Sequence, residues 1–334
     1  MSGDRVRITH STQSDGPTAV ALGNFDGVHR GHERTLEAAI ACGRQQGWQP
    51  TTVTFAPHPR EYFSGRPHLM LTLPEEKAGQ LQQLGIERVV ALPFNRELAR
   101  LSPRAFVEQI LRDRLQTRFI SIGEDFCFGR DRTGTAADLK AIAADSGIEV
   151  TIVPLYSPGG DRASSSAIRQ ALIEGDLDRA NRLLGRAYNL SGTVVLGQQL
   201  GRKLGFPTAN LEVSPRKFLP RWGVYAVWVE LGRGDRLPGV ANIGCRPTVA
   251  GDRPTIEVHL LAGGRDLYGE TLTANLVRFL RPESRFESLE ALKRQIEIDC
   301  QQARDCLQNE FNVSRFAPIQ NSSWKVQGEE NLRP

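Results

Sequence analysis

The fold of the first half of this chain is decided by Gly23-Asn24-Phe25-Asp26-Gly27-Val28-His29-Arg30-Gly31-His32. This stretch follows a short apolar run, Thr18 to Leu22, that predicts a buried strand, and it precedes Glu33 to Cys42, which predicts a helix. Its two histidines therefore lie in the first turn of a helix, where partial positive charge and free backbone N–H groups favour an anion. We interpret the stretch as a cradle for nucleotide phosphates; the alternative is an ordinary strand–helix turn with surface histidines.

Short apolar runs alternate with longer segments of helical spacing from Thr18 to about Gly185. The expected strands are Ala19–Leu22, Thr51–Phe55, Arg88–Leu92, Phe119–Ile122 and Val150–Leu155, and the expected helices between them are Arg34–Arg44, Glu75–Leu84, Pro103–Leu115 and Thr135–Ser146. This alternation predicts βαβ units and an α/β doubly wound parallel sheet. Ligands of such sheets bind beyond the carboxyl ends of the strands, so we expect the loops after the first strands to converge on one crevice.

The pattern changes near Arg186, where strand-like runs are linked by turns that contain Gly and Pro. These runs are Ser191–Leu196, Gly223–Leu231, Gly239–Ile243, Thr255–Leu261 and Thr271–Phe279, and they predict a small antiparallel barrel or sandwich. A C-terminal helix should cover it with one apolar face, formed by Leu289, Leu292, Ile296, Cys300, Ala303 and Leu307. We expect two domains, 15–185 and 186–316, followed by a mobile tail, 317–334.

Composition places the chain among ordinary globular proteins. Of its 334 residues, 40% are hydrophobic and 24% are charged, which excludes a disordered protein. The formal charge of +4 is too small to indicate a nucleic-acid partner, and the five cysteines form no CxxC pair that would suggest zinc. The N-terminal residues lack the apolar core of a signal peptide, and no apolar run approaches the ~20 residues of a membrane span. We expect a cytoplasmic enzyme for small anionic substrates, with no membrane partner.

Three serines open a further expected helix, Ala167 to Glu174. Serine at a helix start usually caps the helix. Ser164, Ser165 and Ser166, with Arg169 one turn later, are also suited to hold a phosphate chain through hydroxyls, backbone N–H groups and a guanidinium. Beside the two histidines we favour phosphate binding, with capping as the alternative. No nucleophile with its own base is evident, and direct transfer at a phosphorus atom needs none.

Thr208 and Asn210 are the polar pair of the second half. On an extended segment both side chains face the same side, and a hydroxyl and an amide oxygen suit Mg²⁺. The alternative is that both residues only form a turn. The preceding segment, Gly197 to Leu204, is not a P-loop, because its glycine spacing is one residue short and no Ser or Thr follows Lys203.

Glu257 lies on one face of an expected strand with His259, while its apolar neighbours share the other face. The polar face is either simply solvated or carries a general base that takes a proton from an alcohol attacking ATP. Strand residues alone leave both interpretations open.

The motifs of the first half resemble a known family. Gly23–His32 is similar to the His-x-Gly-His element of the nucleotidylyltransferase superfamily, and Phe55–Arg60, Gly123–Gly129 and Ser164–Arg169 resemble the adenylyltransferase module of bacterial bifunctional riboflavin kinase/FAD synthetases. The resemblance implies that His29 and His32 stabilise the ATP phosphates in the transition state. It further implies nucleotide contacts from Gly23, Asn24, Phe25, Asp26, Gly27, Ser165, Ser166 and Arg169, and flavin and adenine pockets lined by Phe55, His58, Asp125 and Phe128.

The motifs of the second half are similar to the riboflavin kinase module of the same family, which is a six-stranded antiparallel barrel. They are Gly201–Asn210, Gly223–Tyr225, Asn242–Thr248, Glu257–Leu261 and Asp266–Gly269. The resemblance implies that Thr208 and Asn210 are the ligands of Mg²⁺ with ATP and that Glu257 is the catalytic base.

The resemblance thus implies a two-step enzyme. Riboflavin and ATP give FMN, and AMP transfer from ATP to FMN gives FAD and pyrophosphate. One alternative is a nucleotidylyltransferase for another phosphate acceptor, with an accessory barrel. The other is a catalytically decayed regulator that binds flavin or RNA. The sequence leaves the oligomeric state open.

Overall fold

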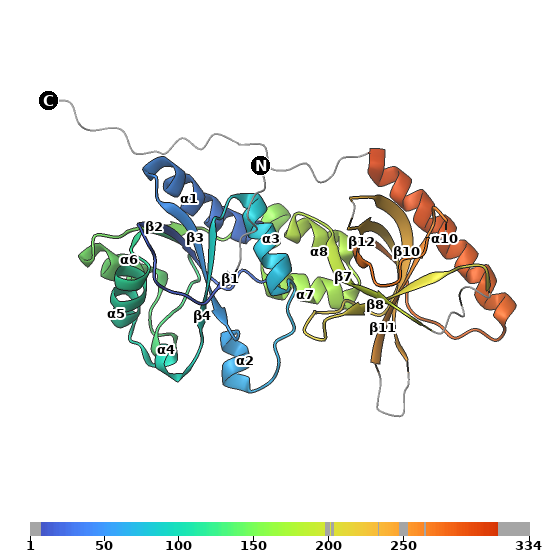
Figure 1. The fold of residues 1–334 in the computed structure, drawn as a ribbon, viewed down its shortest axis with the longest axis horizontal. Helices are drawn as coiled ribbons and strands as arrows, with labels where there is room; N and C mark the ends of the chain where they lie inside the picture. The colour runs from blue at the N-terminus through green and yellow to red at the C-terminus, as the bar shows by residue number, and fades with distance from the viewer. Residues whose placement is uncertain are drawn as a thin grey trace.

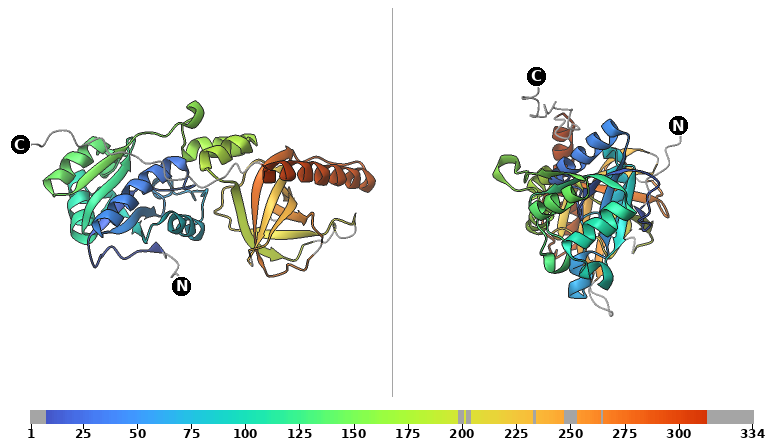
Figure 2. Two further views of the ribbon diagram at one scale, coloured as in Figure 1. Left: turned by 90° about the horizontal axis from the view of Figure 1, so that it is seen from above. Right: turned by 90° about the vertical axis from the view of Figure 1, so that its left-hand side faces the viewer.

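An α/β domain and a β-barrel follow one another along the chain in the computed structural model, which describes residues 8–197, 201, 204–232, 234–246, 253–263 and 265–312. Helices α7 (Ser165–Glu174) and α8 (Leu177–Leu184) lie between the sheet and the barrel (Figure 1 and Figure 2). The expected mobile tail, 317–334, lies outside the described residues.

The N-terminal domain contains a parallel sheet with the strand order β1-β4-β3-β2-β5-β6. Its strands are β1 (Ile8–Thr9), β2 (Thr18–Leu22), β3 (Gln49–Ala56), β4 (Arg88–Pro93), β5 (Thr117–Gly123) and β6 (Glu149–Val153). Strands β3 and β4 lie on one side of β2, and β5 and β6 lie on the other side. The prediction of a doubly wound sheet is therefore confirmed. The loops after β2 and β5 separate at the point where the strand order reverses, which is where such sheets bind ligands.

Helices cover both faces of the sheet because β2 is apolar on both sides. Val20 and Leu22 pack against π-helix η1 (Phe106–Arg114) and α6 (Ala136–Asp145), while Ala19 and Ala21 face α1 (Arg30–Gln46) and α3 (Pro74–Leu84). The helix expected over Pro103–Leu115 begins as α5 (Pro103–Ala105) and continues as η1. The remaining short elements are α2 (Pro59–Ser64), α4 (Arg96–Arg100), η2 (Arg130–Arg132) and η3 (Pro158–Gly160).

The second domain is a closed antiparallel barrel, with the strand order β10-β11-β8-β7-β12-β9. Its strands are β7 (Tyr188–Val195), β8 (Thr208–Val213), β9 (Gly223–Leu231), β10 (Arg236–Arg246), β11 (Arg253–Leu260) and β12 (Thr271–Arg281). Strand β9 pairs with both β10 and β12, which closes the sheet. Of the two architectures that the sequence left open, the domain is therefore a barrel and not a sandwich. The apolar interior of the barrel is continuous with buried residues of α7 and α8, among them Ile168, Leu172 and Leu177.

Helix α10 (Leu289–Asn312) covers the outer face of the barrel (Figure 1). Cys300, Ala303 and Leu307 are buried against residues of β9, β10 and β12, as the helical spacing predicts. The prediction is wrong at Leu289, which is 56% exposed, because contact with the barrel begins only near Ile296.

Candidate active sites

A cavity of about 1430 Å³ lies at the carboxyl end of the parallel sheet, surrounded by loops that follow β2 to β6. This volume exceeds the roughly 300–1,000 Å³ of typical ligand pockets, so the cavity has room for a large ligand. Most of the predicted residues of the first half line it: Gly23, Asn24, Phe25, Asp26, His29, His32, Phe55, His58, Asp125, Phe128, Ser165, Ser166 and Arg169. The structure therefore brings together residues as far apart in the sequence as Gly23 and Arg169.

Gly27 is the exception among these predicted residues. Its N–H donates to Oγ1 of Thr72 at 2.9 Å, and its φ of 91° lies in the left-handed region that favours glycine. A Cβ at this position would lie 3.1 Å from a methyl group of Leu71. Gly27 therefore shapes the loop and does not face the cavity.

His29 and His32 form a stacked pair at the N-terminus of α1. His29 is the N-cap residue, and its Nδ1 accepts a hydrogen bond from the backbone N–H of His32 at 3.3 Å. The ring centroids lie 3.6 Å apart, with an angle of 17° between the planes. Because Nδ1 of His29 accepts, Nε2 carries the proton of the neutral ring and is available as a donor.

Burial keeps both imidazoles neutral. It lowers the pKa of His29 to about 4, against an opposing contribution from the Asp26 carboxylate. Burial, followed by the neighbouring His29, lowers the pKa of His32 well below its usual value. Among the described residues, Nδ1 of His32 is itself buried without a hydrogen-bond partner. The pair thus offers neutral donors at a helix N-terminus, an arrangement that suits an anion.

The carboxylate of Asp26, which is only 4% exposed, organises the loop beside the histidines. Its Oδ1 accepts from the backbone N–H groups of Leu71 at 2.9 Å and Thr72 at 3.2 Å, and its Oδ2 accepts from Arg169. Burial raises the pKa of Asp26, but the hydrogen bond with His68 and the charge of Arg169 outweigh this, so the pKa lies well below its usual value. The carboxylate remains ionised.

Arg169 connects α7 to the loop after β2. Besides its ion pair with Asp26, its Nη2 donates to the carbonyl of Leu69 at 3.0 Å and lies 3.2 Å from Nε2 of His68. Arg169 lines the cavity, but the structure engages this nitrogen with protein groups. His68 was not predicted, because it lies outside any sequence motif, in the connection between α2 and α3.

The three serines at the start of α7 differ in what they do. Oγ of Ser164 accepts from the N–H of Ala167 at 3.2 Å and so caps the helix. Oγ of Ser165 donates to the carbonyl of Asp26 at 2.8 Å, which fixes the loop after β2. Ser166 lines the cavity. Ser164 therefore caps the helix, Ser165 holds the loop after β2, and Ser166 lies at the cavity.

The other end of the cavity is aromatic. Phe55 and Phe94 meet edge to face with their centroids 5.7 Å apart, and Phe63 beside Phe94 is 71% exposed. His58 stacks on His68 at 4.0 Å, and its pKa is lowered to about 4, chiefly by burial and then by His68. An exposed aromatic surface of this kind suits a flat ring system.

Two predicted flavin contacts lie on the loop after β5. Asp125 forms an ion pair with Arg162, a cavity residue that was not predicted although it lies only two positions before Ser164. Phe128 is only 5% exposed and packs on Phe106 and Phe126, so it belongs to the core as much as to the cavity.

The polar residues predicted in the second half meet on the outer face of the barrel. In the pairing of β8 with β11, Asn210 lies opposite Glu257 and Thr208 lies opposite His259. On the other side of β11, Asn242 of β10 also lies opposite Glu257. The glutamate is therefore flanked by two asparagines, while the alternate residues of β11, such as Val258, are buried inside the barrel.

The chain before β8 lies directly against Thr208 and Asn210. A Cβ on Gly197 would lie 2.0 Å from Nδ2 of Asn210, and a Cβ on Gly201 would lie 3.3 Å from Oγ1 of Thr208. Glycine is required for this close approach. The predicted motif residues Arg202, Lys203, Pro247 and Thr248 lie outside the described residues.

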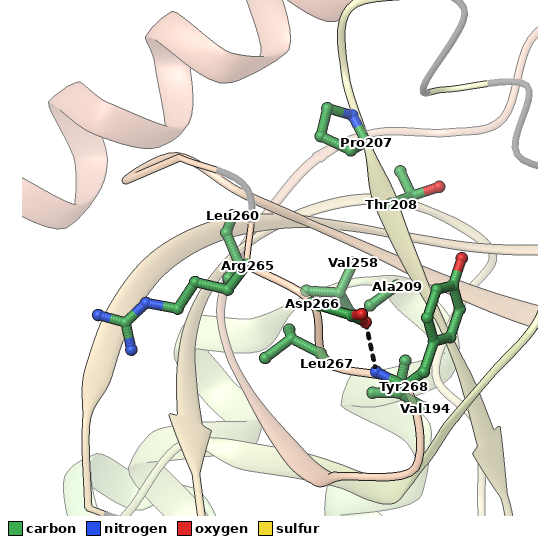
Figure 3. Close-up of a pocket in the computed structure, with 10 residues that line it drawn as sticks. All are labelled: Val194, Pro207, Thr208, Ala209, Val258, Leu260, Arg265, Asp266, Leu267 and Tyr268. Carbon is green, nitrogen blue, oxygen red and sulfur yellow. Dashed lines mark hydrogen bonds between the residues drawn. The ribbon is translucent and has the colours of Figure 1, made fainter.

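A small pocket opens beside Thr208, where Pro207, just before β8, and Ala209 of β8 meet Asp266, Leu267 and Tyr268 (Figure 3). Within the described ranges, no group of three or more His, Cys, Asp or Glu side chains is suited to hold a metal ion. The oxygen donors of Thr208 and Asn210 fit Mg²⁺ instead, because this ion keeps several waters and binds through few protein ligands together with substrate phosphates.

Of the helices that the structure describes, none combines the length and the apolar character needed to cross a membrane.

Comparison with known proteins gives a match for each half. The FAD synthetase family matches residues 11–167, and the riboflavin kinase family matches residues 184–307. The chain is 42% identical to the bifunctional riboflavin kinase/FMN adenylyltransferase of Escherichia coli strain K12, over 86% of this chain and 91% of that protein. Proteins of the same name from Pseudomonas fluorescens and Bacillus subtilis are 42% and 35% identical, over 90% and 89% of this chain and 96% of each relative.

One solved structure, titled a macrolide-efflux protein from Streptococcus pneumoniae, matches 90% of this chain and 99% of its own with a TM-score of 0.82 and 29% identity. The likeness extends over both domains. The two family matches and the curated relatives do not favour either alternative, the accessory barrel or the decayed regulator. The chain belongs to the bifunctional riboflavin kinase/FMN adenylyltransferase family and is a transferase with both activities.

Proposed function

We propose that the cavity of the α/β domain is the FMN adenylyltransferase site and that the outer face of β8 and β11 is the riboflavin kinase site. The division into domains is 15–185 and 186–316. The observation that carries the first assignment is the stacked, neutral pair His29 and His32 in a cavity surrounded by strand-end loops.

In the adenylyltransferase site, a phosphate oxygen of FMN attacks the α-phosphorus of ATP, and the bond to the bridging oxygen of pyrophosphate breaks. Nε2 of His29 and the ring of His32 donate to the phosphates as charge develops. Ser166 and the α7 N-terminus extend this donor set, and Arg169 supplies positive charge. Phe55, His58, Asp125 and Phe128 hold the flavin and adenine rings.

In the kinase site, Glu257 takes the proton of the ribityl primary hydroxyl of riboflavin. That oxygen bonds to the γ-phosphorus of ATP while the bond to the bridging oxygen of ADP breaks. The support is the register that places Glu257 between Asn210 and Asn242. Thr208 and Asn210 would hold Mg²⁺, which neutralises phosphate charge when bound.

The ligands that follow are riboflavin, FMN and ATP with Mg²⁺. We also propose that the protein is cytoplasmic and has neither a nucleic-acid partner nor a membrane partner.

Two substitutions in opposite domains test the assignment. His32→Ala should slow the conversion of FMN to FAD by about 10²- to 10³-fold, by analogy with the removal of one preorganised donor, and should leave FMN formation unchanged. The measurement is the initial rate of each reaction in one preparation, with the flavins separated by chromatography. Equal loss of both rates would contradict separate sites.

Glu257→Gln should do the reverse. The amide keeps the size of the side chain but accepts no proton at neutral pH, so phosphorylation of riboflavin should slow by about 10²- to 10⁴-fold. Externally added FMN should still be converted to FAD at the normal rate. If FMN formation stays within a few-fold of wild type, Glu257 is only a residue of the outer strand face.

A further inference from the structure

The segment Leu69–Thr72, between α2 and α3, holds the phosphate elements of the adenylyltransferase cavity. Leu71 and Thr72 give their backbone N–H groups to the Asp26 carboxylate, and Oγ1 of Thr72 accepts from Gly27. The carbonyl of Leu69 accepts from Arg169. The position of this segment therefore determines where Asp26 and Arg169 lie.

The opposite side of the same segment is held by the barrel domain, through Arg216–Phe218, which follows β8. The N–H of Met70 donates to the carbonyl of Arg216 at 2.7 Å, and the N–H of Phe218 donates to the carbonyl of Met70 at 2.8 Å. Nζ of Lys217 donates to the carbonyl of Leu71 at 3.0 Å. The two domains are thus joined by a parallel β-bridge, between Met70 and Lys217.

Two side chains of Arg216–Phe218 contact the α/β domain. The side chain of Lys217 is 0% exposed and forms an ion pair at 2.6 Å with Glu76 of α3. A buried ion pair costs much desolvation free energy and is weak evidence for stability alone, so its placement calls for another explanation. The ring of Phe218 faces the guanidinium of Arg169 at 5.5 Å, across the domain boundary.

These contacts lie far from the proposed kinase residues. Thr208 and Ser214 are separated by the full length of β8, which corresponds to roughly 20 Å at the rise of a strand. The bonds of Lys217 and Phe218 to Leu71 and Met70 cross to the α/β domain, and none of them reaches Thr208, Asn210 or Glu257 within the part of the chain that the structure describes.

We propose that Lys217 and Phe218 are positioning residues of the adenylyltransferase site that the kinase domain contributes. Through Leu69–Thr72 and the ring beneath Arg169 they fix the geometry of Asp26 and Arg169. Across the domain boundary, Lys217 and Phe218 contact Leu71, Met70 and Arg169, so we expect these two residues to affect adenylyl transfer and not riboflavin phosphorylation. This inference rests on the proposed assignment of the cavity to adenylyl transfer.

The test uses the full chain and two variants. The first is the double variant Glu76→Gln/Lys217→Met, which removes the hydrogen bond from Lys217 to Leu71 and leaves no buried charge without its partner. The amide oxygen at position 76 can still accept the hydrogen bond that the N–H of Leu73 donates to Glu76 in the wild type. Phe218→Leu keeps an apolar side chain and the backbone bonds but removes the ring beneath Arg169.

A control at the same interface is Arg221→Met. Arg221 donates to the carbonyl of Glu174 at the end of α7 and does not contact Leu69–Thr72 among the described contacts. The measurements are kcat and KM for ATP in FAD formation, the rate of FMN formation, and the unfolding temperature of each preparation.

The double variant should lower kcat/KM for FAD formation by about 10-fold or more, because small displacements of a catalytic arrangement have large effects on rate. Phe218→Leu should raise KM for ATP by about 3- to 10-fold, the range of a cation–π contact. FMN formation should stay within twofold of wild type in both, and Arg221→Met should change neither reaction.

If Lys217 and Phe218 only stabilise the fold, the variants will unfold at a lower temperature, but their kcat and KM, measured well below that temperature, will equal those of wild type. That result would overturn the inference. Equal loss of both activities would also overturn it. Failure of the proposed function is distinguished by His32→Ala: if that variant retains FAD formation, the cavity itself has been misassigned.

Discussion

At the level of single residues, the stacked histidines of the cavity make the folded state sensitive to acid. An unfolded histidine takes up a proton near pH 6.5, whereas His29 in the folded protein does so only near pH 4. Between these values the unfolded state binds more protons, so stability falls as the pH falls from about 6.5 to about 4. His32 and His58 act in the same direction, while Asp26 titrates below this range.

His29→Asn should weaken this dependence, since asparagine is also a good N-cap residue but does not titrate. Between pH 7.5 and 4.5 the variant should lose less unfolding free energy than wild type, by on the order of 2 kcal/mol. Urea unfolding followed at several pH values provides the measurement. Parallel curves for the two proteins would show that the His29 ring is not protected from protonation by burial.

At the level of elements, the approach of the chain before β8 sets the geometry of the proposed metal ligands. Gly197→Ala would place a Cβ 2.0 Å from Nδ2 of Asn210, so the strand residue or the preceding chain must move. We expect FMN formation to slow by about 10-fold or more, with a higher Mg²⁺ requirement and unchanged FAD formation from FMN.

The matched control is Gly232→Ala, directly after β9, where an added Cβ meets no atom of the described residues within 4 Å. Rates of both reactions are measured against Mg²⁺ concentration in the two variants. An unchanged Mg²⁺ dependence in Gly197→Ala would mean that Asn210 is not a metal ligand, or that the chain before β8 accommodates the methyl group freely.

At the level of the whole molecule, α8 packs with the barrel although it precedes the boundary expected from the sequence. Leu177, Leu183 and Leu184 are buried in one cluster with the barrel interior. The side chain of Asn181 donates to the carbonyl of Leu276 at 2.9 Å and accepts from the N–H of Tyr188 at 2.8 Å. Removal of α8 exposes this apolar surface.

Two fragments test the division into domains. Fragments from Asp176 to Pro334 and from Arg186 to Pro334 should both form FMN and no FAD, and the longer one should unfold at a higher temperature because it retains α8. Thermal unfolding and riboflavin phosphorylation are measured on each. A folded but inactive longer fragment would mean that the α/β domain supplies kinase residues, and equal unfolding temperatures would mean that α8 contributes nothing to the barrel.

The sequence by itself determined whatever depends on local pattern. The alternation of apolar runs and helical segments is sufficient to predict the doubly wound sheet. Side chains two positions apart on a strand face the same side, so Thr208 and Asn210 share one face whichever strands pair with β8. Motifs that are contiguous, such as Gly23–His32 and Ser164–Arg169, could be found and related to a family without any structure.

Only the tertiary structure decided which groups meet across the chain. Closure of the barrel depends on the pairing of β9 with β12, and the inner position of Gly27 depends on Thr72 and Leu71. The ion pair of Lys217 with Glu76 joins residues 141 positions apart, and no local pattern marks either as buried. Such contacts follow from the packing of two domains, because the free energy of each depends on partners that the local sequence does not contain.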